Sequence, residues 1–412
     1  MQKPVAVLHV GWMPRAVAAL IAAGANVTCA VAPADAVAAR AAGAATVVVP
    51  QPSQVEGVLS GLARDGLALA DYDVICSVLE FCLVPAAVLQ ELAGRSQGAA
   101  LRTLAMRDKY VQKQLVRGAG VPAATSEVLE SLAAADPAAL TFPKVLKPLD
   151  GGGARHTYVL TDEKSARECM ALAAVGGEGP WLLEEYIDGT EFQVDGLVRN
   201  GEIKALSVSR YLQNLIEVHE GGMVAHVALP PAEYPRLYEE IRDVAETSFK
   251  ALEYQDGPFH LEVFQETAGG RIVFGECAAR VGGGRTDDVM ELAFGVNLRS
   301  EWARLMLGSP SALAAPASHT TEGAYGGMNL PAPAGRVLAM PGLDEVLARP
   351  GVVRAQFDIA PGQVMPDVTA ASHLRAGLAV VRGADDSEVT ARMRDLADWF
   401  AGSVEVAPTV TE

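Results

Sequence analysis

Short apolar runs alternate with alanine-rich helical stretches from Pro4 to about Gly94, and this alternation is the strongest constraint on the fold. The apolar runs read VAVLHV, NVTCAV, ATVVVP and YDVICSV. Strands that alternate with helices are typical of a parallel α/β sheet. The turn after the first run, GWMPR, holds only Gly11 and no GxGxxG sequence, so a dinucleotide site is not indicated.

A second unit follows this predicted sheet. We expect a polar-patterned helix from Arg102 to Gly120, which Gly118, Gly120 and Pro122 would end. The runs FPKVLKP and WLLEEYI read as strands that flank a glycine-rich loop and a helix over 163–174. After them, EFQVDGLV, EIKALSVS, FHLEVFQE and GRIVFGE predict a largely antiparallel sheet, with a helix over 232–252 between the second and third runs.

The remainder of the chain reads as a small α+β unit. A helix is predicted from Asp288 to Leu307, and the Pro/Ala-rich sequence GSPSALAAPASH after it reads as a linker. The segment 320–412 has short apolar runs, a Gly/Pro-rich middle and an amphipathic helix near 386–401. We therefore expect a C-terminal cap of mixed helices and strands.

Composition excludes several classes of protein. With 412 residues, half of them hydrophobic, the chain is long enough for about three domains. The formal charge is −17 and no Lys/Arg-rich run occurs, so nucleic acids and anionic membranes are not expected partners. The five cysteines include no CxxC pair, the N-terminus lacks a signal-peptide pattern, and no apolar run reaches the roughly 20 residues of a membrane span. We expect a soluble, cytoplasmic protein.

Two acids flank a predicted hairpin turn. Glu262 lies in FHLEVFQ and Glu276 in RIVFGEC, on either side of TAGG. If the hairpin centres on Gly269, the two side chains face each other on one side of the sheet. At about 4 Å such carboxylates would repel by roughly 4 kcal/mol, so the pair needs a cation, and Mg²⁺ suits oxygen ligands. The alternative is a hairpin whose glutamates merely face water.

Two further stretches suit a nucleotide. In FPKVLKPLDGGGARHTYVL, a strand carries Lys147, and the loop from Gly151 to Gly153 leaves backbone N–H groups open to phosphate oxygens. In WLLEEYIDGTEFQVDG, backbone groups after the strand can bond a purine edge, and Glu191 can accept both ribose hydroxyls. Each pattern is a weak signal by itself. The glycine-rich stretch could instead be an ordinary hairpin, and the acidic stretch could be a polar turn with exposed acids.

The order of these pieces resembles the ATP-grasp superfamily over about residues 1 to 310. The resemblance implies an α/β fold with a Rossmann-like N-terminal domain over 1–100, a linking helix over 101–122 and a mobile lid subdomain over 123–187. It further implies a metal-binding subdomain over 188–310, and the α+β cap would follow over 320–412. ATP and Mg²⁺ are the implied cofactors.

The resemblance also assigns site residues. Lys109 and Lys147 would bind phosphates, and the loop of Gly151, Gly152 and Gly153 would close over them. The adenine would lie against Glu184, Glu185 and Ile187, the last two mainly through backbone groups. Glu191 would bind the ribose, and Glu262 and Glu276 would hold Mg²⁺.

One position departs from the common family pattern. Many members read Glu-x-Asn-x-Arg at the second metal ligand, where this chain reads Glu276-Cys277-Ala278-Ala279-Arg280. The stretch ECAAR is similar to bacterial L-amino acid ligases of the bacilysin-synthetase type, as are HLE before the first ligand and His226 in MVAHVALPP. That subgroup places a glutamate three residues before the histidine, where this chain has Met223. The resemblance implies that His226 contacts substrate.

Arg280 and the glycines after it complete the predicted site. Arg280 can neutralise a substrate carboxylate or an acyl phosphate, and Gly282, Gly283 and Gly284 let backbone N–H groups approach the same anion. We expect an ATP-dependent carboxylate–amine ligase that forms an amide or peptide bond from an amino acid through an acyl phosphate. The expected partners are small-molecule acids and amines, and the family favours a homodimer.

Three alternatives stay open at this point. One is a carboxylase-like phosphorylation of bicarbonate, ranked lower because the motifs are most similar to those of amino acid ligases. A carrier-protein thiol in place of the amine would make the protein a carrier-loading ligase. A nucleotide-binding regulator without turnover is the alternative of another class, suggested by Ala278. Two other side chains are left without an assigned role: His260, read as a strand residue beside the metal site, and Glu80, at the end of a parallel strand.

Overall fold

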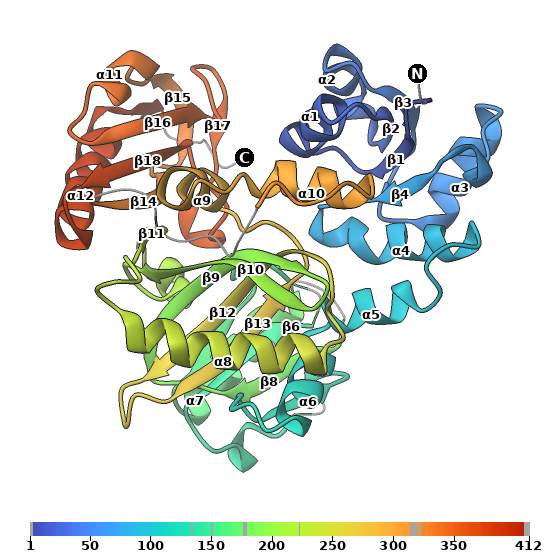
Figure 1. The fold of residues 1–412 in the computed structure, drawn as a ribbon. Coiled ribbons are helices and arrows are strands. Elements are labelled where there is room, and N and C mark those ends of the chain that lie inside the picture. The colour runs from blue at the N-terminus through green and yellow to red at the C-terminus, as the bar shows by residue number, and fades with distance from the viewer. Residues whose placement is uncertain are drawn as a thin grey trace.

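The computed structural model describes residues 3–132, 135–149, 151–175, 179–221, 223–313, 319 and 323–407. Figure 1 shows an N-terminal α/β unit, a central sheet with α8 across it, and a C-terminal unit beside α9. Residues 314–318 of the predicted linker lie outside the described residues. No helix in the described ranges is long and apolar enough to cross a membrane.

The N-terminal unit contains the parallel sheet that the alternating pattern predicts. Its strand order is β3-β2-β1-β4, and every neighbouring pair is parallel. Helices α1, α2 and α10 supply buried side chains to one core cluster of this unit, and α3 and α4 to another. The bounds are β1 Ala6–Val10, α1 Pro14–Ala22, β2 Asn26–Val31, α2 Ala36–Ala41, β3 Ala45–Val48, α3 Val55–Arg64, β4 Val74–Cys76 and α4 Leu83–Leu92.

The linking segment is two helices, so the single helix predicted over 102–120 is wrong. Helix α5 spans Ala99–Ala105 and α6 spans Lys109–Gly118. Asp108 separates them, because its side chain accepts a hydrogen bond from the Val111 amide and caps the new helix. The break places Lys109 in the first turn of α6.

A four-stranded antiparallel sheet forms the next unit, in the order β5-β8-β6-β7. Leu146, Leu160 and Trp181 of this sheet pack against Ala166 and Met170 of the helix α7. The bounds are β5 Ser126–Leu129, β6 Lys144–Pro148, β7 Tyr158–Leu160, α7 Glu163–Val175 and β8 Trp181–Glu185.

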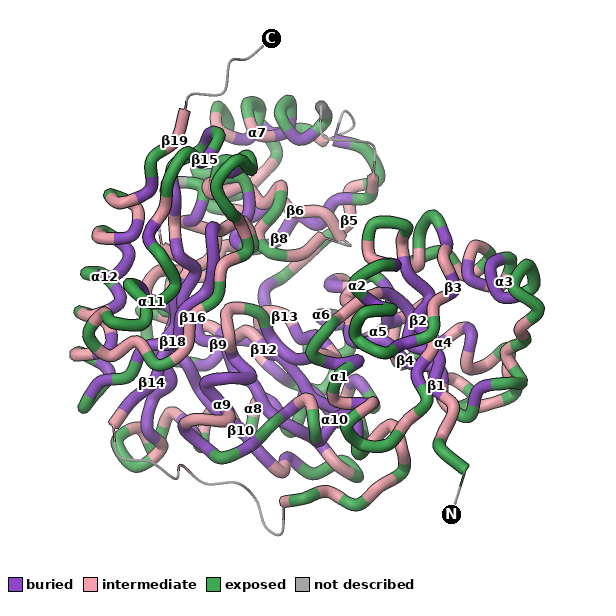
Figure 2. The backbone as a smooth tube through the Cα atoms, turned by 90° about the horizontal axis from the view of Figure 1, so that it is seen from above, coloured by how far each residue is buried: buried purple, intermediate pink, exposed green. Residues whose placement is uncertain are grey.

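The largest sheet has eight strands in the order β13-β12-β9-β10-β11-β14-β18-β16, and all its neighbouring pairs are antiparallel. Strands from the C-terminal segment therefore extend the central sheet through the pair β11–β14. Figure 2 shows the central strands mostly buried, with exposed residues on α3, α7 and α12. The bounds are β9 Gly189–Arg199, β10 Glu202–Tyr211, β11 Ala225–Ala228, α8 Pro235–Ala251, β12 Gly257–Glu266, β13 Ile272–Ala278, β14 Ala324–Leu330, β16 Val352–Phe357 and β18 Gly377–Gly383.

The helix predicted over 288–307 is also two helices, α9 Thr286–Phe294 and α10 Leu298–Met306. Gly295, at φ +68°, ends the first, and the Asn297 side chain caps the second by accepting from the Ser300 amide. The remaining elements are α11 Leu343–Leu347, α12 Asp386–Ser403 and a small sheet in the order β17-β15-β19. The strands of that sheet are β15 Gly335–Ala339, β17 Val364–Met365 and β19 Glu405–Ala407.

The three parts of the chain meet at Asp288. Its buried carboxylate accepts hydrogen bonds from Arg15 of α1 at 2.8 and 3.0 Å and from Arg285 at 2.8 Å. It also pairs with Arg354 of β16. These cations outweigh the effect of burial and lower the pKa of Asp288 to about 2. One acid in α9 thus joins the N-terminal unit to the C-terminal strands.

Candidate active site

The hairpin β12–β13 pairs Glu262 directly with Glu276, as predicted. A bulge at Gly275 produces this register, since the strand pairs Val263 with Phe274 on the turn side of it. If the register of the turn side continued without a bulge, Glu262 would lie opposite Gly275, and the side chains of Glu262 and Glu276 would point to opposite faces. A Cβ atom at Gly275 would lie 2.9 Å from the Glu262 carbonyl oxygen, so the bulge fits glycine closely.

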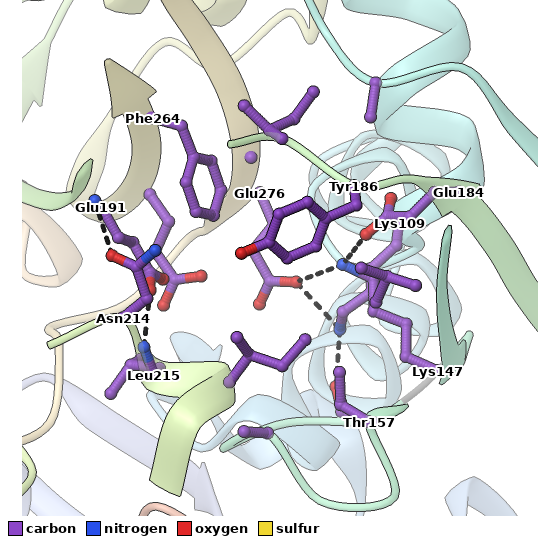
Figure 3. A pocket seen from close by; sticks show the side chains of 18 of the residues that line it. Lys109, Lys147, Thr157, Glu184, Tyr186, Glu191, Asn214, Leu215, Phe264 and Glu276 are labelled. Atoms are coloured by element: carbon purple, nitrogen blue, oxygen red, sulfur yellow. Dashed lines mark hydrogen bonds and ion pairs between the residues drawn. The ribbon is translucent and has the colours of Figure 1, made fainter. Parts of the chain in front are cut away.

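A cavity beside these acids, which we call the lysine pocket, is lined by three lysines: Lys109, Lys113 and Lys147. Lys109 Nζ lies 3.4 Å from Glu276 Oε2, and Lys147 Nζ lies 3.9 Å from the same atom. Lys147 Nζ also lies 2.5 Å from Glu184 Oε1. Figure 3 shows Glu276 beside these lysines, with Glu191 and Asn214 on the other side of the pocket.

Burial and neighbouring charges together shift the pKa values of Glu276 and Glu191 in opposite directions. Burial opposes the ionisation of Glu276, but Lys109 and Lys147 outweigh it and lower the pKa of this carboxyl to about 2. Burial, followed by the charge of Glu262, raises the pKa of Glu191 well above its ordinary value. Glu276 is therefore held as a carboxylate, whereas an incoming hydrogen-bond donor would stabilise the ionised form of Glu191.

The predicted adenine and ribose residues line the same pocket. The lining includes Glu184, Glu185, Ile187 and Glu191, together with Tyr186, Asn214, Leu215, Ile216, Phe264 and Phe274. Glu191 Oε2 accepts a 2.7 Å hydrogen bond from the Leu215 amide, and Asn214 Oδ1 accepts from the Glu191 amide at 3.0 Å. These contacts hold Glu191 in place in the pocket wall.

Sequence reasoning missed several members of the pocket. Lys113 follows Lys109 by one helical turn and is buried, with its Nζ 2.9 Å from Glu184 Oε2. The i, i+4 spacing of two lysines was the available signal for it. Asn214 and Leu215 come from a connection between β10 and β11, for which the sequence carried no comparable pattern.

The glycine loop borders the lysine pocket. Gly151, Gly152 and Gly153 all line it, and Gly153 has φ +67°, which favours glycine. Lys109 Nζ donates a 2.6 Å hydrogen bond to the Gly151 carbonyl, and the Gly153 carbonyl accepts from the Ser372 amide at 2.9 Å. The loop is thus tied both to α6 and to the C-terminal segment.

A larger space, which we call the arginine cleft, continues from the lysine pocket along the N-terminal unit. Its volume is about 1360 Å³, above the roughly 300–1,000 Å³ of a typical single-ligand pocket. The lining includes seven arginines: Arg15, Arg107, Arg155, Arg280, Arg285, Arg299 and Arg375. Such a cleft has room for more than one small molecule and suits anionic groups.

Glu80 holds two of these arginines. Arg280 Nε pairs with Glu80 Oε2, and Arg107 Nε lies 3.2 Å from Glu80 Oε1. Arg280 also donates a 3.1 Å hydrogen bond to the Val281 carbonyl. Burial works against the charge of Arg280, but Glu80 outweighs it and raises the arginine's pKa. Glu80, left without a role at the level of sequence, therefore orients Arg280 across the cleft.

His226 and the glycines after Arg280 form another wall of the arginine cleft. His226 Nε2 lies 3.0 Å from the Gly284 carbonyl oxygen, and burial lowers the pKa of His226 to about 4. Gly283 also lines this wall. Met223, at the position of the subgroup's glutamate, packs against an apolar core cluster. The position offers no charge for a substrate amino group.

His260 lies across from Ala278 in the same sheet. Its Nδ1 is 3.0 Å from Asp195 Oδ1, and its Nε2 is 3.6 Å from Glu262 Oε1. Burial lowers and Asp195 raises the pKa of His260, which reaches about 10. The histidine therefore lies between two acids.

The residues fit a nucleotide with a divalent cation. Within the described ranges, no three His, Cys, Asp or Glu side chains are arranged to hold a metal by themselves. Two adjacent carboxylates beside three lysines match the need of a cation that takes its other ligands from phosphates. All five cysteines are free, and four are buried.

Two known protein families match parts of this chain. Residues 140–288 match the ATP-grasp domain family, and residues 328–400 match L-amino acid ligase C-terminal domain 2. The L-arginine-specific L-amino acid ligase of Bacillus subtilis is 24% identical over 325 residues, which are 76% of each chain.

Solved structures share the fold. An L-amino acid ligase from Bacillus licheniformis aligns with a TM-score of 0.79 and 18% identity, over 99% of this chain and 100% of that one. N5-carboxyaminoimidazole ribonucleotide synthetase from Thermotoga maritima aligns with a TM-score of 0.70 and 19% identity, over 98% and 100% of the two chains.

Proposed function

Because the chain carries an ATP-grasp domain followed by an L-amino acid ligase C-terminal domain, we propose that it is an ATP-dependent carboxylate–amine ligase acting on amino acids. The observation that carries the proposal is the juxtaposition of Glu262 and Glu276 with Lys109 and Lys147 in one pocket. The product would be an amide or peptide bond, formed with release of ADP and phosphate.

We assign the lysine pocket to ATP. Lys109 and Lys147 would bind the phosphates, with the backbone of Gly151, Gly152 and Gly153 above them. The adenine would lie against Glu184 and the backbone of Glu185 and Ile187, and Glu191 would accept the ribose hydroxyls. Glu262 and Glu276 would hold Mg²⁺, which supplies positive charge at the phosphate oxygens.

The arginine cleft would hold the two organic substrates. The carboxylate of the first attacks the γ-phosphorus of ATP, and ADP leaves, which gives an acyl phosphate. The amine of the second, as the free base, attacks the acyl carbon, and phosphate leaves. Arg280 and the backbone of Gly283 and Gly284 would stabilise the negative charge on the reacting acyl group, while His226 would contact substrate from the same wall as the glycines.

The glycine loop would act as the lid. Its contacts with Lys109 and with the Ser372 amide close one side of the lysine pocket. Exclusion of water there would protect an acyl phosphate from hydrolysis.

The experiment is phosphate release from ATP and Mg²⁺ across a panel of amino acids, singly and in pairs. We expect release with a particular pair and none with Glu276→Ala. Release only with a carrier protein present would move the acceptor from an amine to a thiol. If the protein binds ATP but no pair, acid or carrier provokes release, the ligase proposal is wrong.

A further inference from the structure

Lys113 has no role in the function proposed above, although it is the most buried of the three pocket lysines. Its side chain is 2% exposed, against 8% for Lys109 and 14% for Lys147. Besides its ion pair with Glu184, Lys113 Nζ donates a 2.7 Å hydrogen bond to the carbonyl of Gly275, the bulge residue. It is therefore anchored on two strands from different sheets.

The pocket charges form one chain that alternates in sign. Lys113 lies 2.9 Å from Glu184, and Glu184 lies 2.5 Å from Lys147. Lys147 lies 3.9 Å from Glu276, which lies 3.4 Å from Lys109. Each Glu184 oxygen thus faces a different lysine. Only the Lys113 end of the chain is fixed away from the glycine loop.

Binding of a triphosphate would disturb this chain in the middle. A phosphate would compete with Glu184 for the ammonium group of Lys147, whose Nζ lies 2.5 Å from Glu184 Oε1. Glu184 has a side chain that is 8% exposed, and a buried carboxylate without a cation is strongly unfavourable. Lys113 would prevent this, because its anchor on Gly275 keeps it beside Glu184 while Lys147 moves.

We propose that Lys113 is a positioning residue for ATP: it remains paired with Glu184 when Lys147 turns to the phosphates, so that nucleotide binding leaves no buried charge unpaired. The inference rests on the proposed function only for the binding of ATP, not for the ligation step. If Lys113 has this role, its loss should weaken nucleotide binding, whereas the loss of a purely structural lysine should lower only the stability of the fold.

The test measures ATP and ADP affinity by calorimetry in the wild type, Lys113→Met, Glu184→Gln and the double variant. In Lys113→Met, Lys147 is the remaining partner of Glu184, so nucleotide binding should weaken on the order of 100-fold. A glutamine needs no counter-ion. The double variant should therefore bind within about 10-fold of Glu184→Gln alone, which is the signature of coupling between the two positions.

Lys164→Met is the matched control, since it removes a lysine from an exposed ion pair with Glu168. A merely structural Lys113 would lower the unfolding temperature without ligand and leave nucleotide affinity unchanged, and that result would overturn the inference. So would a double variant in which the losses of affinity of the two single variants simply add. If Lys113→Met does not fold, the double variant is compared with Glu184→Gln alone, and a 100-fold gap between them contradicts the proposal. A wild type that binds neither nucleotide would instead remove the proposed function.

Discussion

The lysine pocket and the arginine cleft both gather cations, but they use them differently. In the lysine pocket the cations lie beside two glutamates, Glu184 and Glu276, that also line the cavity. In the arginine cleft several arginines are bound to acids that join parts of the chain, such as Asp288 between Arg15 and Arg354. The first arrangement can exchange partners with a ligand, while the second mainly holds the walls of the cleft in place.

Substitution of Arg280 should give the largest difference between the two regions, because it should affect the reaction in the arginine cleft and not ATP binding in the lysine pocket. We expect Arg280→Met to lower the rate of phosphate release with substrates on the order of 100-fold or more, because a charge aimed at the reacting group is lost. ATP affinity, measured by calorimetry, should change little, since Arg280 lies outside the lysine pocket. Glu80 keeps Arg107 as a partner in this variant. A large loss of ATP affinity would show that the two regions are not separable in this way.

Gly275→Ala should distort the β12–β13 bulge that positions Glu262 and Glu276 in the lysine pocket. The added Cβ would lie 2.9 Å from the Glu262 carbonyl, so the bulge must shift or open. We expect a loss of about 1–3 kcal/mol in the free energy of unfolding, and weaker nucleotide binding as Glu262 and Glu276 lose their alignment. Urea denaturation and calorimetry measure the two effects. Gly402→Ala, where no atom lies within 4 Å of the new Cβ and φ is not positive, is the control for the change of residue type alone. Equal effects of both changes would contradict the role of the bulge.

The smallest effect concerns the walls of the arginine cleft and depends on pH. The pKa of Asp288 falls from 3.8 to about 2 in the folded protein, because Arg15 and its other partners stabilise the carboxylate. The unfolded chain takes up this proton first as pH falls, so the stabilisation is complete above about pH 4 and disappears towards pH 2. Urea denaturation should show Asp288→Asn less stable than the wild type at pH 7, with the gap closing on acidification. A gap that is the same at pH 7 and pH 3 would contradict this account.

The sequence predicted the units of the fold better than their boundaries. The parallel sheet followed from local periodicity. The facing of Glu262 and Glu276 was predicted from a regular hairpin, but in the structure it depends on the bulge at Gly275, which periodicity does not indicate. The breaks at Asp108 and at Gly295 were missed, because each lies within a continuous helical pattern and depends on one cap. The union of β14 with β11 involves segments about a hundred residues apart, and no local pattern indicates such a pairing.

The candidate site also contains residues that local motifs predict and contacts that they do not. Local sequence motifs predicted site roles for Lys147, Glu191 and the glycine loop, and in the structure all of them line one pocket. Glu80 and Arg280 are 200 positions apart, so their pairing depends on how the units pack. The roles assigned to the site residues stay predictions that the experiments above address.

The continuous sheet has a consequence for recombining such proteins. The seam between β11 and β14 is made of main-chain hydrogen bonds, which any non-proline sequence can form. A chimera that takes its C-terminal strands from a relative would keep these bonds and would have to match the apolar side chains beneath them. Exchange at this seam would replace one wall of the arginine cleft and, in the lysine pocket, would change only the contact between the Gly153 carbonyl and the Ser372 amide.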